Sequence, residues 1–299
     1  MLSIVVCSKN KTLSKDLVDN IINTVGVDYE IITVDNSENK YSIFTAYNFG
    51  FSKSKYKYIC FVHEDVFFHS LNWGKKVIAH LQDPDTGIVG LAGGDLVSRV
   101  PAVWAGFFST SMNIIQSDRT GKKPSKAFIQ PEDFNHSQRP VILLDGVFLC
   151  MRRDLMEIIH FDEKMKGFHG YDLDISIQST VKGFVNYVIY DIELEHFSRG
   201  KTCAVYYRNL ITVFKKWEGS LPLFLKDITQ KQFTEISKIE VNNLSRLTKK
   251  MVRKGFKSSE ITTETLYFRN IIASEKEINF LKLQIFFIRL FNSPKFLFK

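Results

Sequence analysis

The first part of the chain alternates between short apolar runs and segments with apolar residues at helical spacing. The β-branched runs at 2–8, 29–36 and 56–65 predict strands, and 13–25 and 42–54 predict the helices between them. This alternation is typical of an α/β fold with a largely parallel sheet and helices on both faces. In such sheets ligands bind at the carboxyl ends of the strands.

The same pattern continues to about residue 217. Further strands are expected at 87–94, 141–153 and 184–198, and further helices at 73–81, from 154, within 167–183, and at 205–217. Residues 93–140 follow neither period and contain four prolines, so an irregular loop is predicted there. A loop of that length within a compact domain is usually functional.

The chain changes character after "SLP" at 220–222, where it becomes helical, Lys-rich and Phe-rich. We therefore expect one domain at 1–220 and a helical region at 221–299. The second region holds fifteen Lys/Arg against seven Asp/Glu, an excess that equals the whole net charge of +8. Its basic and apolar stretches, 247–259 and 280–299, fit docking on an anionic membrane, packing on the rest of the protein, or packing on a second subunit. No nucleic-acid motif is recognised, so no nucleic-acid partner is expected.

The four cysteines form no CxxC pair, and three of them lie inside apolar runs. This pattern argues against a disulfide framework and against a zinc site, and it favours a reducing cytosol. The N-terminal "MLSIVVCSKN" lacks the features of a signal peptide, and no apolar run reaches the length of a membrane span.

A cluster of polar side chains ends the third predicted strand. In "FVHEDVFF", at 61–68, His63, Glu64 and Asp65 follow a buried apolar run. Carboxylates are the ligands that Mg²⁺ and Mn²⁺ prefer, and both ions are commonly shared with substrate phosphates. The alternative is a solvated turn, since acidic residues are common at strand ends.

Three other positions carry candidate chemistry. Asp172 and Asp174 open a predicted helix about 200° apart, so one could act as a general base while the other caps the helix. Both could equally be helix N-terminal acids that favour the dipole. His196 follows a predicted strand and fits a metal ligand or a structural histidine. Asp35, at the end of the second strand, fits a ligand contact or a turn.

The order of these motifs resembles the GT-A nucleotide-sugar glycosyltransferases. From residue 2 to about 200 the chain runs through "VDNS", "YNFGF", "FVHEDV", "LDGVFLCMRR", "GYDLDISIQ" and "EHFS". It is similar in particular to the inverting family 2, and within it to a small branch with a His-x-Asp tip in place of D-x-D. The resemblance implies a Rossmann-like GT-A fold, followed here by the helical C-terminal region.

The resemblance also implies a role for each matched residue. Asp172 corresponds to the catalytic base, and Asp65, His63 and His196 to the ligands of Mn²⁺ or Mg²⁺. The residues that it assigns to nucleotide-sugar binding are Ser8, Asp35, Asn48, Gly50, His63 and Glu64. The residues that it assigns to the acceptor and sugar pocket are Asp145, Gly146, Phe148 and Tyr171.

Two residues differ from the family pattern. His63 stands where the first Asp of D-x-D is usual, and Tyr171 stands where a Glu usually precedes the base. Histidine can bind Mn²⁺, and Asp172 itself is retained, so the metal site and the base are both still expected.

The implied activity is inverting transfer of a sugar from a UDP-sugar or another nucleotide sugar. The expected acceptor is a glycan or lipid-linked glycan in surface polysaccharide or glycoconjugate synthesis. The expected location is the cytoplasm, with peripheral contact to the cell membrane. The alternatives are a catalytically inactive binding module of the same fold and a nucleotidyltransferase. The latter normally carries a Gly-rich loop after strand one, which "SKNKTLSKD" lacks.

Overall fold

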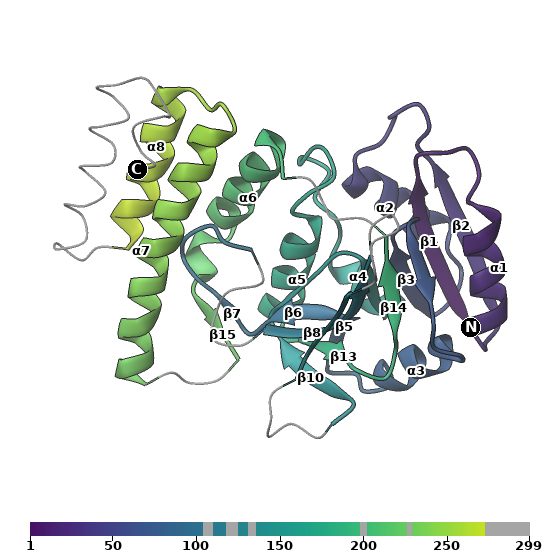
Figure 1. The fold of residues 1–299 in the computed structure, drawn as a ribbon. Helices are drawn as coiled ribbons and strands as arrows, with labels where there is room; N and C mark the ends of the chain where they lie inside the picture. The colour runs from purple at the N-terminus through teal and green to yellow at the C-terminus, as the bar shows by residue number, and fades with distance from the viewer. Residues whose placement is uncertain (104–109, 118–124, 131–135, 198–201, 226–228, 273–299) are drawn as a thin grey trace. The chain divides into compact units, whose positions relative to one another are not determined.

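The computed structural model describes residues 1–103, 110–117, 125–130, 136–197, 202–225 and 229–272. The chain forms two compact units (Figure 1). Unit 1 comprises residues 1–96 and 104–201, and unit 2 comprises residues 97–103 and 202–299. The units divide at 201/202 and the segment 97–103 joins the second, whereas the sequence predicts a division near 220. The assignment of separate functions to residues 1–220 and 221–299 stays a prediction.

Unit 1 contains strands and helices in alternation, as the sequence predicts. Its first elements are β1 (Leu2–Ser8), α1 (Lys15–Thr24), β2 (Tyr29–Asp35), α2 (Ile43–Lys53), β3 (Tyr58–Val62), β4 (Val66–Phe68), α3 (Trp73–His80), β5 (Thr86–Gly90) and β6 (Ala92–Gly94). They are followed by β8 (Thr110–Gln116), β9 (Ser125–Ile129), β10 (Gln138–Val141), β11 (Leu143–Leu144), β12 (Phe148–Arg152), α4 (Arg153–Ile158), α5 (Tyr171–Val181), β13 (Val185–Ile189) and β14 (Leu194–His196). The strand β7 (Leu96–Val97) lies where the chain passes from unit 1 to unit 2.

The main sheet of unit 1 has seven strands in the order β10-β13-β5-β12-β3-β1-β2. The strand β1 pairs in parallel with both β2 and β3, which confirms the α/β class. The sheet is mixed rather than largely parallel, because β12 runs antiparallel to both β3 and β5. The carboxyl ends of β1, β2 and β3 therefore meet at one edge.

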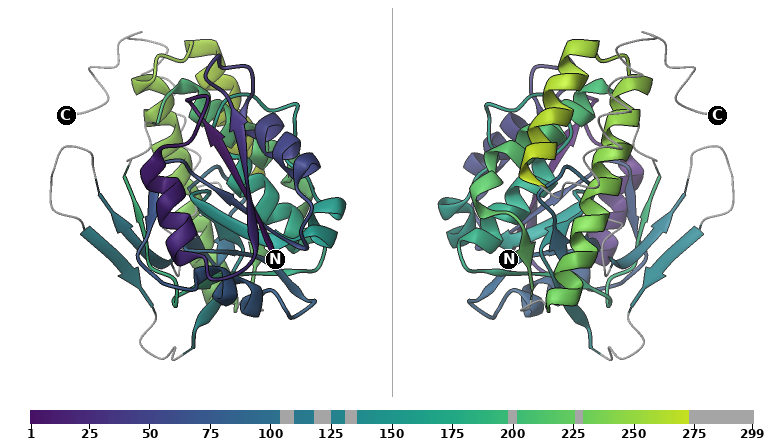
Figure 2. Two further views of the ribbon diagram at one scale, coloured as in Figure 1. Left: turned by 90° about the vertical axis from the view of Figure 1, so that its right-hand side faces the viewer. Right: turned by 90° about the vertical axis from the view of Figure 1, so that its left-hand side faces the viewer.

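Helices cover both faces of this sheet because successive side chains of β1 point in opposite directions. Leu2, Ile4 and Val6 pack in one core with Leu17 and Ile21 of α1. Val5 faces the other way, toward α2, and the left-hand view of Figure 2 shows α1 and α2 to either side of β1. The predicted cap of α2 is confirmed, because the Ser42 hydroxyl accepts a hydrogen bond from the Thr45 backbone N–H.

The glycine in the middle of α2 allows this helix to approach β1 closely. A Cβ atom on Gly50 would lie 2.2 Å from Cγ1 of Val5. We expect Gly50→Ala to lower the free energy of unfolding by about 1–3 kcal/mol, because the core must shift to admit the methyl group. Chemical denaturation measures this. Gly219→Ala is the control, since among the described residues no atom other than those of its immediate chain neighbours lies within 4 Å of its Cβ position. Equal stability of the two variants would contradict the prediction.

A second sheet of unit 1 has the order β11-β6-β8-β14-β4, with β9 paired to β8. The prediction of an irregular loop at 93–140 is therefore wrong for the described part of that segment. The hairpin of β8 and β9 is antiparallel, and Met112 lies opposite Ile129. The sequence does not predict these strands because their side chains are mixed in polarity and only partly buried. They therefore lack the clear apolar–polar alternation that is typical of a strand.

Two core cysteines face each other across the main sheet. The antiparallel pairing of β12 with β3 places Cys150 opposite Cys60, and the two form a disulfide with a Cα–Cα distance of 4.1 Å. The expectation of no disulfide is therefore wrong. The two residues are 90 positions apart, so only strand pairing could bring them together. The cysteine content consequently gives no support to a reducing compartment, and the cytoplasmic location stays a prediction.

Unit 2 is mainly helical in its described part. It contains α6 (Ala204–Lys216), the 3-10 turn η1 (Glu218–Ser220), β15 (Leu223–Phe224), α7 (Gln230–Arg253) and α8 (Ser258–Ile271). The helices α7 and α8 lie side by side (Figures 1 and 2) and bury Leu244, Met251 and Phe268. The basic stretch 247–259 includes the end of α7 and the start of α8, whereas the apolar and basic stretch 280–299 lies outside the described residues.

A buried ion pair stabilises unit 2. The Glu240 carboxylate has no exposed side-chain surface, and it accepts hydrogen bonds from the Arg99 guanidinium and from the Arg99 backbone N–H. We expect Arg99→Met to cost about 3–5 kcal/mol, because the buried carboxylate loses the cation that compensates its charge. Chemical denaturation measures this, and the control is Arg99→Met combined with Glu240→Leu. If the double variant were as unstable as the single one, the uncompensated charge would not be the cause.

None of the helices in the described residues is both long enough and apolar enough to cross a lipid bilayer.

Candidate metal and donor site

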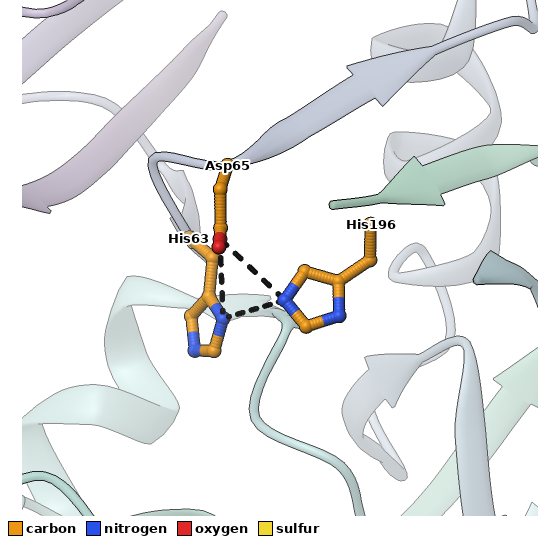
Figure 3. Close-up of side chains that lie close together, drawn as sticks. All are labelled: His63, Asp65 and His196. Atoms are coloured by element: carbon orange, nitrogen blue, oxygen red, sulfur yellow. Dashed lines mark hydrogen bonds and ion pairs between the residues drawn. The ribbon is translucent and has the colours of Figure 1, made fainter. Parts of the chain in front are cut away.

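Three side chains from two segments, the turn between β3 and β4 and the end of β14, converge at the edge where β3 ends. His63 Nδ1 lies 3.4 Å from His196 Nε2, and Asp65 Oδ1 lies 3.9 Å and 3.5 Å from these two nitrogens (Figure 3). All three are partly buried, and one ligand atom from each lies within 4.8 Å of the others. The structure thus brings together the three residues that the sequence predicts as metal ligands.

Strand pairing explains this convergence. His63 follows β3 directly, and its backbone N–H donates to the Val147 carbonyl oxygen. The chain then turns into β4, which pairs antiparallel with β14 so that His196 lies opposite Val66. The Phe197 N–H donates to the Asp65 carbonyl oxygen and closes the pair. His196 is therefore fixed beside Asp65, although 131 positions separate them in the sequence.

This donor set suits a divalent cation. One carboxylate oxygen and two imidazole nitrogens are appropriate ligands for Mn²⁺ and for other first-row divalent metals, and are less suited to Mg²⁺, which prefers oxygen. Burial and the neighbouring His196 lower the pKa of His63. A lowered pKa keeps the imidazole neutral, which is the form that binds a metal.

A cavity of about 180 Å³ opens beside the triad. Its walls come from the ends of β1, β2 and β3 and from the start of α2 and α5. The lining residues are Cys7, Lys9, Asn36, Ile43, Tyr47, His63, Glu64, Asp65, Phe168 and Tyr171. The cavity therefore lies at the carboxyl ends of the parallel strands, which is where the fold class predicts a ligand.

Glu64 connects the ends of β3 and β1. Its carboxylate accepts a hydrogen bond from the Ser8 hydroxyl at 2.7 Å and another from the Lys9 backbone N–H at 3.1 Å. Ser8 is fully buried below it and is paired in register with Asp35. The sequence places Ser8 and Glu64 at the donor site, and both lie at the cavity edge of the sheet.

Asp172 begins α5 next to the cavity residue Tyr171. Burial and, after it, the negative charge of Asp145 raise the pKa of Asp172 to about 7, against backbone N–H donors that lower it. Asp174 points elsewhere, since it is buried and accepts a hydrogen bond from Gln178. The two acids therefore have separate environments, and Asp172 is the one with the pKa of a base that works near neutral pH.

Three residues predicted to contact the donor lie outside the lining of this cavity, and their contact with a donor stays a prediction. Asp35 is exposed and accepts from the Ser37 N–H, which lowers its pKa. Asn48 hydrogen-bonds the backbone of Phe161 through both its amide nitrogen and its amide oxygen. Gly50 packs against β1. None of the three lines the 180 Å³ cavity, so the structure does not bring them to the metal triad.

The residues predicted for the sugar pocket lie in different surroundings, one in the core and the others near the cavity. Phe148 is fully buried and makes edge contacts with the stacked rings of Phe68 and Trp73, so its side chain belongs to the core and does not line the cavity. Gly146 lies under Tyr171, whose hydroxyl oxygen would be 2.1 Å from a Cβ at this position. Asp145 lies close enough to act electrostatically on both Asp172 and His63.

Sequence reasoning missed several cavity residues. Lys9 and Asn36 come directly after β1 and β2, so the strand-end rule that selected His63 would have found them too. Phe168 is 43% exposed although aromatic, and it lines the cavity just before α5. Nothing in its local sequence distinguished it from the core aromatics of this Phe-rich chain.

A family model described as "Glycosyltransferase like family" matches residues 3–217, well over half of the sequence. The chain belongs to this glycosyltransferase-like family. The match confirms the resemblance drawn from the motifs and covers every residue of the metal triad and the cavity. A search of curated protein sequences finds no match.

Several solved structures are similar to this glycosyltransferase-like chain. A crystal structure of GalNAc-T7 with UDP, GalNAc and Mn²⁺ is 12% identical, with a TM-score of 0.49, and the match covers 80% of this chain and 54% of that one. A crystal structure of residues 1–349 of S. aureus TarS is 13% identical, with a TM-score of 0.49, and the match covers 82% of this chain and 71% of that one. The mannosyltransferase PcManGT from Pyrobaculum calidifontis, in complex with GDP-Man and Mn²⁺, is 11% identical. The match covers 96% of this chain and 84% of that one, with a TM-score of 0.48. The chain thus spans about half the length of the GalNAc-T7 chain that it matches.

Proposed function

We propose that this chain transfers a sugar from a nucleoside diphosphate sugar to an acceptor hydroxyl, with inversion at the anomeric carbon. The observation that carries the proposal is the convergence of His63, Asp65 and His196 at the mouth of a strand-end cavity. Membership of a glycosyltransferase-like family supports it. UDP-sugars are the first donors to test.

The residues of the cavity suit the donor. A divalent cation held by His63, Asp65 and His196 would neutralise the negative charge that develops on the departing diphosphate. Lys9 offers a second positive charge on the cavity wall. Phe168 and Tyr47 provide apolar surface for the base or the sugar ring. Glu64 holds the end of β1 to the end of β3, which keeps these walls in place.

Asp172 is the proposed general base. As the acceptor oxygen forms its bond to the anomeric carbon, the bond from that carbon to the diphosphate oxygen breaks. The acceptor proton passes to Asp172, and the nucleoside diphosphate leaves with the electron pair. One displacement inverts the anomeric configuration, and no covalent intermediate with the protein is needed. A pKa of about 7 lets the carboxylate accept this proton near neutral pH.

The acceptor and the cellular setting belong to the proposal as well. We propose a glycan or a lipid-linked glycan as acceptor, in surface polysaccharide or glycoconjugate synthesis at the cytoplasmic face of the membrane. The basic excess of residues 221–299 supports contact with anionic lipid. Binding to vesicles with and without anionic lipid tests this contact.

A thermal unfolding screen tests the donor proposal. The protein is heated with a panel of nucleoside diphosphates and nucleotide sugars, with and without Mn²⁺. A ligand that binds the native state raises the melting temperature by mass action. We expect a Mn²⁺-dependent rise with one nucleotide, which would identify the base. No rise with any nucleotide would contradict the proposal, and binding without turnover would indicate an inactive binding module.

A further inference from the structure

The orientation of the two histidine rings decides whether the triad can bind a metal. His63 turns Nδ1, and His196 turns Nε2, toward Asp65, while the other nitrogen of each ring points away (Figure 3). A neutral imidazole carries a hydrogen on one nitrogen and a lone pair on the other. Both inner nitrogens can therefore bind a metal only if both outer nitrogens carry the hydrogen. The partners of the outer nitrogens determine this.

Gln116 determines the hydrogen position on His196. The Gln116 amide nitrogen donates to the carbonyl oxygens of Ser117 at 3.2 Å and of His196 at 3.0 Å. Only the NH₂ group can donate to two carbonyls, so the amide oxygen is the atom that lies 3.4 Å from His196 Nδ1. An amide oxygen only accepts, and hence His196 Nδ1 carries the hydrogen. The lone pair on Nε2 then faces Asp65.

Tyr171 determines the hydrogen position on His63. Its hydroxyl donates to the Gly146 carbonyl oxygen at 3.0 Å, and the same hydroxyl oxygen lies 2.8 Å from His63 Nε2. A hydroxyl has one hydrogen, and a carbonyl cannot donate. With that hydrogen on the Gly146 carbonyl, the contact with His63 is donated by His63 Nε2–H, which leaves the lone pair of Nδ1 facing Asp65.

The Tyr171 hydroxyl is held in place from several sides. The ring is 4% exposed and makes edge contacts with Phe44 and Tyr47. Gly146 leaves the space that the hydroxyl occupies, because a Cβ there would lie 2.1 Å from it. The two positions that differ from the family pattern, His63 and Tyr171, are thus hydrogen-bonded to each other.

We propose that Tyr171 and Gln116 are positioning residues that fix the tautomers of His63 and His196, so that both lone pairs and the Asp65 carboxylate converge on one divalent cation. This inference rests on the metal site of the proposed function. Outer hydrogen bonds of this kind fix ring orientation and increase ligand basicity in metal sites. Tyr171 accordingly supports the metal ligand rather than the sugar pocket.

Metal binding by the full chain tests the proposal without any substrate. Mn²⁺ affinity is measured by electron paramagnetic resonance, and the visible spectrum is recorded with Co²⁺ alone. We expect Tyr171→Phe and Gln116→Met each to weaken Mn²⁺ binding by about 10–100-fold and to alter the Co²⁺ spectrum. The matched control is Tyr190→Phe, which also removes a hydroxyl bonded to a backbone carbonyl, that of Ile129. Its affinity and spectrum should match those of the wild type.

A second measurement needs no folded variant. Nitrogen-15 spectra of the histidines in the metal-free wild type, recorded at alkaline pH, report the tautomers directly. We expect hydrogen on Nε2 of His63 and on Nδ1 of His196. The opposite tautomer on either ring would overturn the assignment for its partner.

The outcomes separate this inference from the proposed function. Folded variants that bind Mn²⁺ as tightly as the wild type would overturn the positioning roles and leave the transferase proposal intact. Failure of the wild type itself to bind Mn²⁺ or Co²⁺ would overturn both the positioning roles and the metal dependence.

Discussion

Asp172→Asn is expected to lower the rate of sugar transfer by about 10²–10⁴-fold, because the variant has no group to take the acceptor proton. Donor affinity should stay within about threefold of the wild type, since the metal ligands and the cavity walls are untouched. Turnover is measured by release of the nucleoside diphosphate, and donor affinity by calorimetry. A variant with near-normal turnover would remove Asp172 as the base.

Stability provides the control for this variant. The pKa of Asp172 in the folded chain, about 7, lies above the ordinary value of about 3.9. The protonated carboxyl is therefore the form that the fold favours, and the stability it contributes is lost as the pH rises from about 4 to about 7. At pH 8 the asparagine variant should melt at the same temperature as the wild type or higher. Lost activity together with a lower melting temperature would instead indicate damage to the fold.

The pH profile of the wild type follows from the same pKa. A base works only when deprotonated, so kcat/KM should rise with pH and reach half of its plateau near pH 7. Below that point it should fall about tenfold for each pH unit. A profile that is flat from pH 5 to 8 would contradict this role.

Asp65→Ala is expected to weaken Mn²⁺-dependent donor binding by about 100-fold or more, because the triad loses its only carboxylate. Removal of divalent ions with a chelator should have the same effect on the wild type, and the two effects should not add. Affinity is measured by calorimetry with and without Mn²⁺. The matched control is Glu157→Gln, which alters an exposed carboxylate on α4.

Unchanged donor affinity in the Asp65 variant would show that this strand end is a plain turn. A loss of affinity that is equal with and without Mn²⁺ would indicate that Asp65 contacts the donor itself. Only the Mn²⁺-dependent loss supports a metal ligand, so the two titrations must be run on the same preparations.

Local pattern was enough to predict the elements of the main sheet other than β10, and the edge of the sheet at which a ligand is expected. The apolar run before His63 predicted β3, and the Ser42 cap predicted the start of α2. Both features depend on residues within one segment, where spacing alone decides which side chains share a face. The strand-end rule then placed His63 and Asp65 at the cavity.

Contacts between distant segments could not be predicted from such patterns. The sequence suggested Phe148 for a sugar pocket and predicted no disulfide at Cys60. In the structure Phe148 is fully buried on β12, and the pairing of β12 with β3 places Cys60 opposite Cys150, with which it forms a disulfide. The strands at 110–116 and 125–129 were missed because partly buried, polar strands show little alternation.

The sequence by itself determined the α/β class, the family and the choice of His63, Asp65 and His196 as candidate metal ligands, since each depends on short motifs in order along the chain. Tertiary structure alone decided that β4 pairs with β14 and so brings His196 to Asp65. It also decided that Tyr171 meets His63 and that burial moves the pKa of Asp172 to about 7. The physical reason is that hydrogen-bond partners and dielectric surroundings are properties of neighbours in space, and the order of residues fixes those neighbours only through the folded sheet.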